Sequence, residues 1–287
     1  MKQPDNRYTF RFFDYKWKKV PHWGRETEAI YRRWYLTRYG YATLARLKTF
    51  LRDKSRILEA GCGLARDSKM FAEANPRADI VAMDQSPAAL KVARKTLKPF
   101  GNCRVVRADI TRFTGLEPFD FISCDQALHH TPAPAKTLRH LYRNLAGGGV
   151  LNFFVCRKKN PYRDLVDDRI MDRARTLSPR QLWQFAEVVT RFGEALHGLG
   201  VENVSFRRRR YEDLQRFVHN QVFRCWYNPE IDFKLSVSSN YDWFSGNPRF
   251  DAAGVRGIMR EGLGPHKVLR FYEDDASISV SIRKNVE

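Results

Sequence analysis

The segment 56–67 constrains the fold of this chain more than any other stretch. It reads Arg-Ile-Leu-Glu-Ala-Gly-Cys-Gly-Leu-Ala-Arg-Asp, so a short apolar run ends in Glu59 and is followed at once by Gly61 and Gly63. The pattern is typical of a buried strand that enters a glycine turn and then a helix. Because glycine has no Cβ and accepts positive φ, such a turn lets the backbone approach a bound ligand closely.

The remaining sequence predicts an α/β fold. Short apolar runs alternate with helical patterns, and continuous apolar strands of this kind form parallel sheets that helices cover on both faces. Towards the C-terminus, a helical pattern and two strand patterns predict a hairpin at one edge of the sheet. The expected strands are 56–59, 80–83, 104–107, 119–124, 150–155, 267–272 and 277–282; the expected helices are 67–74, 87–97, 135–145 and 251–262; the three glycines at 147–149 are expected to form a tight turn.

We expect three parts in the chain. Residues 1–54 form a basic helical extension, because aromatic residues and leucines recur at helical spacing over 25–52. Residues 55–155 and 247–287 form the α/β core. Residues 156–246 form a mostly helical insertion, with helical patterns at 162–175, 179–197 and 211–218 and then an aromatic-rich irregular stretch. An insertion at the carboxyl edge of a sheet is placed to serve as a cap for a substrate.

The charge of the chain is concentrated at its start. The formal net charge is +19, and residues 1–54 carry 14 Lys and Arg against 5 Asp and Glu. A basic, aromatic-rich segment suits nucleic acid or an anionic membrane, and a solvated Arg-rich surface is the alternative.

The sequence predicts a cytoplasmic protein. Its start is polar and basic, unlike a secretory signal, and no apolar run approaches the ~18–20 residues of a membrane span. Its five cysteines form no C-x-x-C pair, which indicates reduced thiols rather than a zinc or redox site.

Polar residues follow each of the first four expected strands. Glu59 lies at the end of the first strand, Asp84 and Gln85 follow the second, Asp109 follows the third, and the run 125–130 (Asp-Gln-Ala-Leu-His-His) follows the fourth. Ligands of such sheets bind at the carboxyl ends of the strands. We therefore expect these side chains to meet at one ligand site.

The order of acid and glycines distinguishes between two cofactors. A dinucleotide-binding turn reads Gly-x-Gly-x-x-Gly/Ala, but here Arg66 stands where its last small residue belongs. An acid ahead of the glycines would repel a pyrophosphate, whereas it can accept hydrogen bonds from a cationic amino-acid group. The pattern favours S-adenosylmethionine (SAM), which carries an ammonium and a sulfonium and no phosphate.

Together these residues resemble the class I SAM-dependent methyltransferases, with their Rossmann-like seven-stranded sheet. The resemblance rests on the segments 57–63, 108–109, 119–120, 128–130 and 145–149 and on Asp84, and Ala65 replaces the family's usual third glycine. The segments 13–17 (Phe-Asp-Tyr-Lys-Trp) and 240–244 (Asn-Tyr-Asp-Trp-Phe) are similar to a methyltransferase type 11/12-like bacterial subgroup that often modifies small molecules or glycans.

The resemblance implies a role for each residue of the cofactor site. Glu59 would interact with the methionine end of SAM, Asp84 with both ribose hydroxyls and Asp109 with the adenine amino group. Ile110 would offer an amide to the adenine ring. The other implied cofactor residues are Gly61, Cys62, Gly63, Gln85, Asp125 and Gln126.

Several residues are candidates for the acceptor side. His129 and His130 are candidate bases, because a histidine pKa near neutrality suits proton removal, although a histidine here can also pack against or cap a helix. Tyr241 and Asp242 are candidates on the insertion, with a hydrophobic clasp as the alternative. Tyr15, Trp17, Tyr241 and Trp243 are the candidate substrate contacts; the four arginines at 207–210 could bind an anionic group or form a solvated face.

Three functions follow from these observations. The first is methyl transfer to an oxygen or nitrogen of a small metabolite, natural product or glycan precursor, an anionic one included. The second is methylation of RNA through the basic N-terminal segment, although no recognisable RNA-binding module is present. The third is SAM binding without methyl transfer. No metal site is predicted.

Overall fold

One mixed sheet of seven strands forms the centre of the structure, a computed structural model that describes residues 6–22, 24–159, 161–199, 226–246 and 248–286. The strand order is β3-β2-β1-β4-β5-β7-β6. Strands β1 to β5 are parallel, and β7 runs antiparallel to both β5 and β6. The bounds are β1 Arg56–Ala60, β2 Asp79–Asp84, β3 Cys103–Arg107, β4 Phe119–Cys124, β5 Leu145–Cys156, β6 His266–Glu273 and β7 Ser277–Lys284.

The chain divides into two units. The first contains residues 1–158 and 248–287 and holds the sheet; the second contains residues 159–247. The helices of the first unit are α1 Asn6–Lys19, α2 Arg25–Arg38, α3 Leu44–Leu51, α4 Arg66–Ala74, α5 Pro87–Leu97, α6 Pro134–Arg143 and α11 Ala252–Gly262, with a short 3₁₀ turn η1 Leu128–His130. The described helices of the second unit are α7 Pro161–Ala174, α8 Pro179–Gly198 and α10 Phe233–Phe244.

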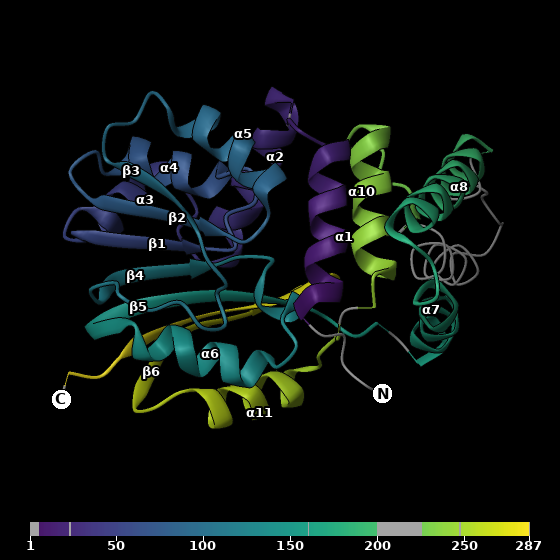
Figure 1. The fold of residues 1–287 in the computed structure, drawn as a ribbon. Coiled ribbons are helices and arrows are strands. Elements are labelled where there is room, and N and C mark those ends of the chain that lie inside the picture. Colours follow the sequence, from purple (N-terminus) through teal and green to yellow (C-terminus); the bar gives the residue numbers. More distant parts are fainter. Residues whose placement is uncertain (1–5, 23, 160, 200–225, 247, 287) are drawn as a thin grey trace, which may run out of the picture. The chain divides into compact units, whose positions relative to one another are not determined.

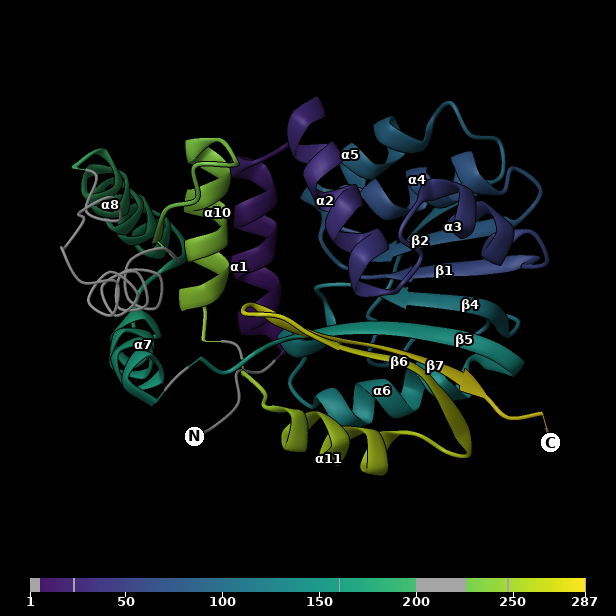
Figure 2. The ribbon, with the colours of Figure 1, turned by 180° about the vertical axis from the view of Figure 1, so that it is seen from behind.

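Helices cover both faces of the sheet in the first unit, as Figures 1 and 2 show. Neighbouring residues of each strand alternate between the faces. Ile57, Ile80 and Phe121 pack with α2, α3 and α4 on one face, while Leu58 and Val81 pack with α6 and α11 on the other. This alternation of buried residues confirms the predicted α/β fold with its seven-stranded sheet.

Local sequence explains where α5 begins. Ser86 is the N-cap, its Oγ accepts a hydrogen bond from the amide of Ala89 at 3.2 Å, and Pro87 occupies the first turn. A serine cap followed by proline satisfies one free amide and removes another. Only two residues therefore separate the start of α5 from Asp84, which ends β2 at the carboxyl edge of the sheet.

The three glycines at 147–149 do not form the expected separate turn before the fifth strand. β5 already begins at Leu145, which pairs with Phe119, and the register shifts before Val150 pairs with Phe121. Only Gly148 of the three has positive φ, at 74°. A β-bulge absorbs the extra residues, so the strand continues through the glycines.

The chain leaves the sheet and returns to it at adjacent positions. Arg157, just after β5, forms an isolated parallel bridge with Phe250, and the amide of Lys158 donates to the Phe250 carbonyl at 2.8 Å. The Nζ of Lys158 also lies 2.9 Å from Oδ2 of Asp251, the N-cap of α11. The second unit thus begins and ends at two segments that are hydrogen-bonded to each other.

The aromatic-rich stretch of the second unit was expected to be irregular, and this prediction was wrong over residues 233–244. Residues 233–244 form α10, which begins at the N-cap Asp232. The side-chain Nδ2 of Asn240 donates to Thr190 Oγ1 on α8 at 2.8 Å, so buried polar contacts hold this helix. Its serines weaken the apolar periodicity that would reveal a helix in the sequence. The expected helix 211–218 lies outside the described residues.

None of the helices within the described ranges combines the length and the apolar character that a bilayer crossing requires.

Two glycines of α11 provide a matched test of the packing of α11 on α6. A Cβ at Gly262 would lie 2.7 Å from the backbone oxygen of Ala135 on α6, whereas a Cβ at Gly257 would meet no atom within 4 Å. We expect Gly262→Ala to lower the free energy of unfolding by about 1–3 kcal/mol through overpacking. Gly257→Ala should raise it by about 0.5–1 kcal/mol through helix propensity. Urea unfolding measures both, and equal effects would contradict this packing.

Candidate active site

The glycine loop that follows β1 has the backbone conformation that its sequence indicates. Gly61 and Gly63 have φ of 82° and 52°, and the amides of Gly61 and Cys62 both donate to the Met83 carbonyl at 2.8 Å. A Cβ at Gly61 would lie 2.5 Å from the Ala127 Cβ in the loop after β4. Only glycine therefore allows these two loops to approach each other so closely. Burial raises the pKa of the Cys62 thiol, which stays protonated.

Asp84 at the end of β2 joins this glycine loop to the start of α5. Its Oδ2 accepts from the amide of Gly63 at 2.9 Å, and its Oδ1 accepts from the amide of Ser86 at 2.8 Å. Burial raises the pKa of the Asp84 carboxyl, and the backbone amides that donate to it, together with the charge of Lys16, oppose that rise. Gln85, the next residue, is half-buried.

Glu59 is buried at the end of β1, with 6% of its surface exposed. Its Oε2 accepts from the amide of Ser68 at 2.8 Å and from the Ser68 hydroxyl. Burial and the neighbouring Asp67 raise the pKa of Glu59 from 4.5 to about 8, and the bonds from Ser68 and the charge of Arg66 limit the rise. Glu59 thus belongs to an acidic cluster that the N-terminus of α4 partly neutralises.

Three further members of this acidic cluster, Arg66, Asp67 and Tyr39, were not predicted as site residues, whereas Asp125 was. Arg66 forms a bidentate pair with Asp67 at 2.7 and 3.1 Å and lies 3.5 Å from Oδ2 of Asp125, after β4. The Tyr39 hydroxyl of α2 donates to Oδ1 of Asp125 at 2.9 Å. In the sequence, Arg66 only argued against a dinucleotide. A basic–acidic pair beside a glycine turn was the available signal for an ion-pair network there.

The residues that follow β3 form hydrogen bonds and an ion pair with one another. Oδ1 of Asp109 accepts from the amide of Thr111 at 3.0 Å and from its hydroxyl at 2.8 Å. Oδ2 of the same carboxylate lies 3.2 Å from Arg112. Ile110 is half-buried and packs against the core. Asp109 is therefore held as a turn residue at the sheet edge, in the position the sequence predicts.

The loop after β4 brings both candidate histidines to the same edge. Gln126 has φ of 54° and donates to Asp125 at 3.0 Å. The ring of His129 is 2% exposed, and its centroid lies 3.9 Å from that of His130. Nε2 of His129 lies 3.4 Å from Sγ of Cys156 at the end of β5.

The two histidines differ in burial. Burial, the neighbouring His130 and the charge of Lys16 hold the pKa of His129 well below 6.5, although the Phe154 carbonyl and Asp125 act in the opposite direction. His129 is consequently uncharged at neutral pH and a weak base. His130 is half-buried, and its ring centroid lies 4.4 Å from that of Phe13 on α1.

Helix α1 contacts three loops at the carboxyl edge of the sheet, and Figure 1 shows it beside the ends of the strands. Asp14 Oδ1 accepts from the Ser86 hydroxyl at 2.9 Å and from the Ala88 amide at 3.1 Å, at the start of α5. The ring of Trp17 contacts the glycine loop, because a Cβ at Gly63 would lie 2.9 Å from its Cζ2. Phe13 contacts the loop after β4 through His130. Asp14 was not predicted as a site residue.

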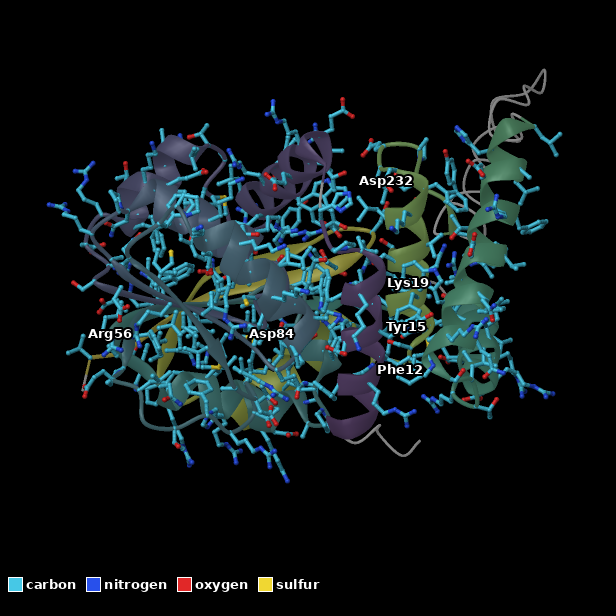
Figure 3. All side chains as sticks on the ribbon, turned by 45° about the horizontal axis from the view of Figure 1, so that its top comes forward. Phe12, Tyr15, Lys19, Arg56, Asp84 and Asp232 are labelled. Atoms are coloured by element: carbon cyan, nitrogen blue, oxygen red, sulfur yellow. The ribbon has the colours of Figure 1, made fainter. Side chains whose placement is uncertain are left out.

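Tyr15 and Trp17, paired in the sequence prediction, lie on different faces of α1. Helical spacing groups Trp17 with Phe13, and it groups Tyr15 with Phe12 and Lys19, a group that Figure 3 labels. The Lys19 Nζ lies 5.6 Å from the Tyr15 ring centroid.

The candidates on the insertion lie on α10, in the second unit. Tyr241 is 1% exposed, and its ring centroid lies 5.5 Å from that of Trp183 on α8. Trp243 donates from Nε1 to Oδ2 of Asp167 at 2.9 Å, and Asp167 pairs with the buried Arg163 at 2.8 Å. Asp242, between them, is half-buried. Tyr241 and Trp243 therefore contact other residues of the second unit. The arginines at 207–210 lie outside the described residues.

Comparisons with known proteins identify the family. A family model described as a methyltransferase domain matches residues 51–186. The malonyl-[acyl-carrier protein] O-methyltransferase of Paenibacillus sp. (strain JDR-2) is 34% identical over 233 residues, which cover 76% of this chain and 75% of that protein. The chain belongs to the class I SAM-dependent methyltransferases. The cofactor of this family is SAM, as the order of acid and glycines predicted.

Two further likenesses agree with this family. The trans-aconitate 2-methyltransferase of Streptomyces avermitilis is 33% identical over 115 residues, or 39% of this chain and 43% of that protein. The fold resembles that of the N-methyltransferase NodS from Bradyrhizobium japonicum WM9, with a TM-score of 0.51 and 14% identity over 96% of this chain and 98% of NodS. The match covers 25% to 44% of the length of the first curated relatives, less than half.

The raised pKa of Glu59 has a measurable consequence for stability. The carboxyl titrates near 4.5 in the unfolded chain and near 8 in the folded protein, so the folded state binds this proton more tightly. The contribution is complete below pH ~4.5 and is lost as the pH rises to about 8. We therefore expect Glu59→Gln, without cofactor, to raise the free energy of unfolding at pH 8 by on the order of a few kcal/mol and to leave it nearly unchanged at pH 4.5. Urea unfolding at the two pH values measures both. Glu117→Gln, at an exposed site, should show no such difference; a Glu59→Gln gain that is equal at both pH values would contradict the raised pKa.

Proposed function

We propose that this protein transfers a methyl group from SAM to an oxygen or nitrogen of a small metabolite, natural product or glycan precursor. The observation that carries this proposal is the link through Asp84, whose carboxylate accepts amides from both the glycine loop and the start of α5. That link joins the loops that follow β1 and β2 at the edge where α/β sheets bind ligands.

The residues at this edge fit SAM. In this proposal Glu59 and Asp125 lie on the side of the methionine ammonium, with Gln126 beside them. Asp84 accepts the ribose hydroxyls, Gln85 lies beside it, and Asp109 and Ile110 face the adenine. The buried carboxylates suit a cofactor that is cationic and carries no phosphate. The absence of a Cβ at Gly61 and Gly63 leaves backbone amides open to close approach.

The protein's own contribution would be to orient the reactants and exclude water. SAM supplies a methyl group on a positively charged sulfur, which is reactive without further activation. Phe13 and Trp17 would shield that edge, since their rings contact His130 and the glycine loop. Because His129 is a weak base, His130 is the stronger candidate for removing a proton from a hydroxyl or ammonium acceptor.

A small-molecule acceptor is supported over RNA. The relatives described above are named for a malonyl group on a carrier protein and for trans-aconitate. Some cations of the basic N-terminal segment also make contacts within the first unit. Lys16 is buried, Lys18 pairs with Asp14 at 2.7 Å, and Arg38 is buried against Phe154. Lys16 and Arg38 therefore contribute to the packing of α1 and α2 rather than to an open basic surface, whereas Lys18 is exposed.

Calorimetry tests the cofactor and the role of Asp84 together. Wild type should bind SAM and not NAD. Asp84→Asn should weaken SAM binding by about 10- to 100-fold, because one oxygen that accepts from ribose is replaced by a donor. Asp79→Asn, at the opposite end of the same strand, should change it less than about threefold, because Asp79 forms only partly exposed pairs with Arg104 and Arg56. Binding of NAD but not SAM would overturn the proposal.

Transfer of labelled methyl distinguishes the acceptor classes. Label in a polar metabolite extract and not in RNA is the expected result. Label in RNA, with binding that weakens steeply as salt rises, would favour the RNA alternative. SAM binding without transfer to either would favour a protein that binds SAM and transfers nothing.

A further inference from the structure

Lys16 on α1 is a buried cation beside the candidate active site. Only 6% of its surface is exposed. Its Nζ lies 4.4 Å from the Trp17 ring centroid and 5.4 Å from the Phe13 ring centroid. Because Trp17 contacts Gly63 and Phe13 contacts His130, the ammonium lies where α1 spans the glycine loop and the loop after β4.

The charge of Lys16 affects a residue at the end of β2 and a residue after β4. It lowers the pKa of Asp84, against the effect of burial, and it lowers the pKa of His129 in the same direction as burial. The cofactor of this family adds a positive sulfonium at the same edge. An acceptor bound here therefore meets two positive charges, and an anionic acceptor group would be stabilised by both.

An acceptor that is already deprotonated needs neither His129 nor His130 as a base. His129, the most buried imidazole at the ends of β4 and β5, is uncharged and a weak base, and its Nε2 faces the Cys156 thiol at 3.4 Å. A carboxylate is ionised at neutral pH and needs no base before it attacks a methyl group. A neutral alcohol would need one, and an ammonium would also be repelled by Lys16.

We propose that the methyl acceptor is a carboxylate and that the Lys16 ammonium binds it. The inference rests on the methyl transfer proposed above. One bond forms between a carboxylate oxygen and the methyl carbon, while the methyl–sulfur bond breaks and leaves its electron pair on sulfur. The negative charge of the acceptor and the positive charge of the sulfonium cancel, and no proton is released. Charge-assisted hydrogen bonds from the ammonium would hold the carboxylate during this step.

The stability of the product in base identifies the acceptor. A polar metabolite extract is separated by anion exchange into acidic and non-acidic fractions, and each is incubated with the full chain and methyl-labelled SAM. A methyl carboxylate ester releases labelled methanol in mild alkali, whereas N-methyl groups, ethers and methyl phosphates retain their label. We expect label in the acidic fraction that alkali converts to volatile methanol.

Substitutions at Lys16 then assign its role. Lys16→Met should lower kcat/KM for the labelled acid by about 100-fold, with SAM affinity within about threefold of wild type. Lys16→Arg should recover at least a tenth of the wild-type value, because it keeps the charge. Lys19→Met removes the same charge from an exposed position about one turn further along α1 and should change kcat/KM less than about threefold. Thermal unfolding of each variant checks that it is folded.

Each contrary result overturns a different statement. Base-stable label, or label only in the non-acidic fraction, overturns the carboxylate acceptor and leaves methyl transfer intact. A Lys16→Met variant that loses SAM affinity but keeps its KM for the acid shows that Lys16 binds the cofactor instead. No transfer to either fraction by SAM-bound protein overturns both this inference and the proposed function.

Discussion

The two hydrogen bonds to the Asp84 carboxylate organise the first unit at its functional edge. One oxygen holds the glycine loop after β1, and the other holds the turn that starts α5. Ser86, at that turn, in turn donates through its hydroxyl to Asp14 of α1. A single side chain at the end of one strand thus fixes the relative positions of two loops and, through Ser86, of a third element more than 60 residues earlier in the sequence. Burial of this carboxylate raises the pKa of Asp84, so its arrangement depends on the amides that stabilise its charged form.

The parts of the site that could be predicted from the sequence are those that depend on local rules. Glu59, Asp84 and Asp125 lie at or directly after the ends of buried strands, and Asp109 lies two residues after the edge strand β3. The parallel sheet brings such positions to one edge. The expected strands and helices of the core are present for the same reason, since their apolar periodicity is strong. The bulge in β5 was missed because two-residue alternation says nothing about pairing across neighbouring strands.

What could not be predicted depends on tertiary packing. Nothing in the segment 13–17 indicates that Asp14 caps α5 or that Lys16 is buried, because both facts arise only when α1 packs on loops distant in sequence. Similarly, Arg66 and Asp67 gain their importance from Glu59 and Asp125, which burial brings together. Helix α10 escaped prediction because polar side chains such as Asn240 are buried in it, so its sequence lacks an apolar stripe. In each case the decisive partner lies on another element.

The hydrogen bonds between the segments at Arg157 and Phe250 allow the inserted segment to be replaced during evolution. The chain leaves the sheet after β5 and returns before α11 at neighbouring backbone positions. Both ends of the segment 159–247 are therefore joined to the core at one place. Closing a loop at such adjacent anchor points places little constraint on its length or sequence. Evolution could exchange the whole segment, and with it any acceptor preference it confers, without altering the register of the sheet. The same junction offers a natural point for grafting a segment from another methyltransferase onto this core.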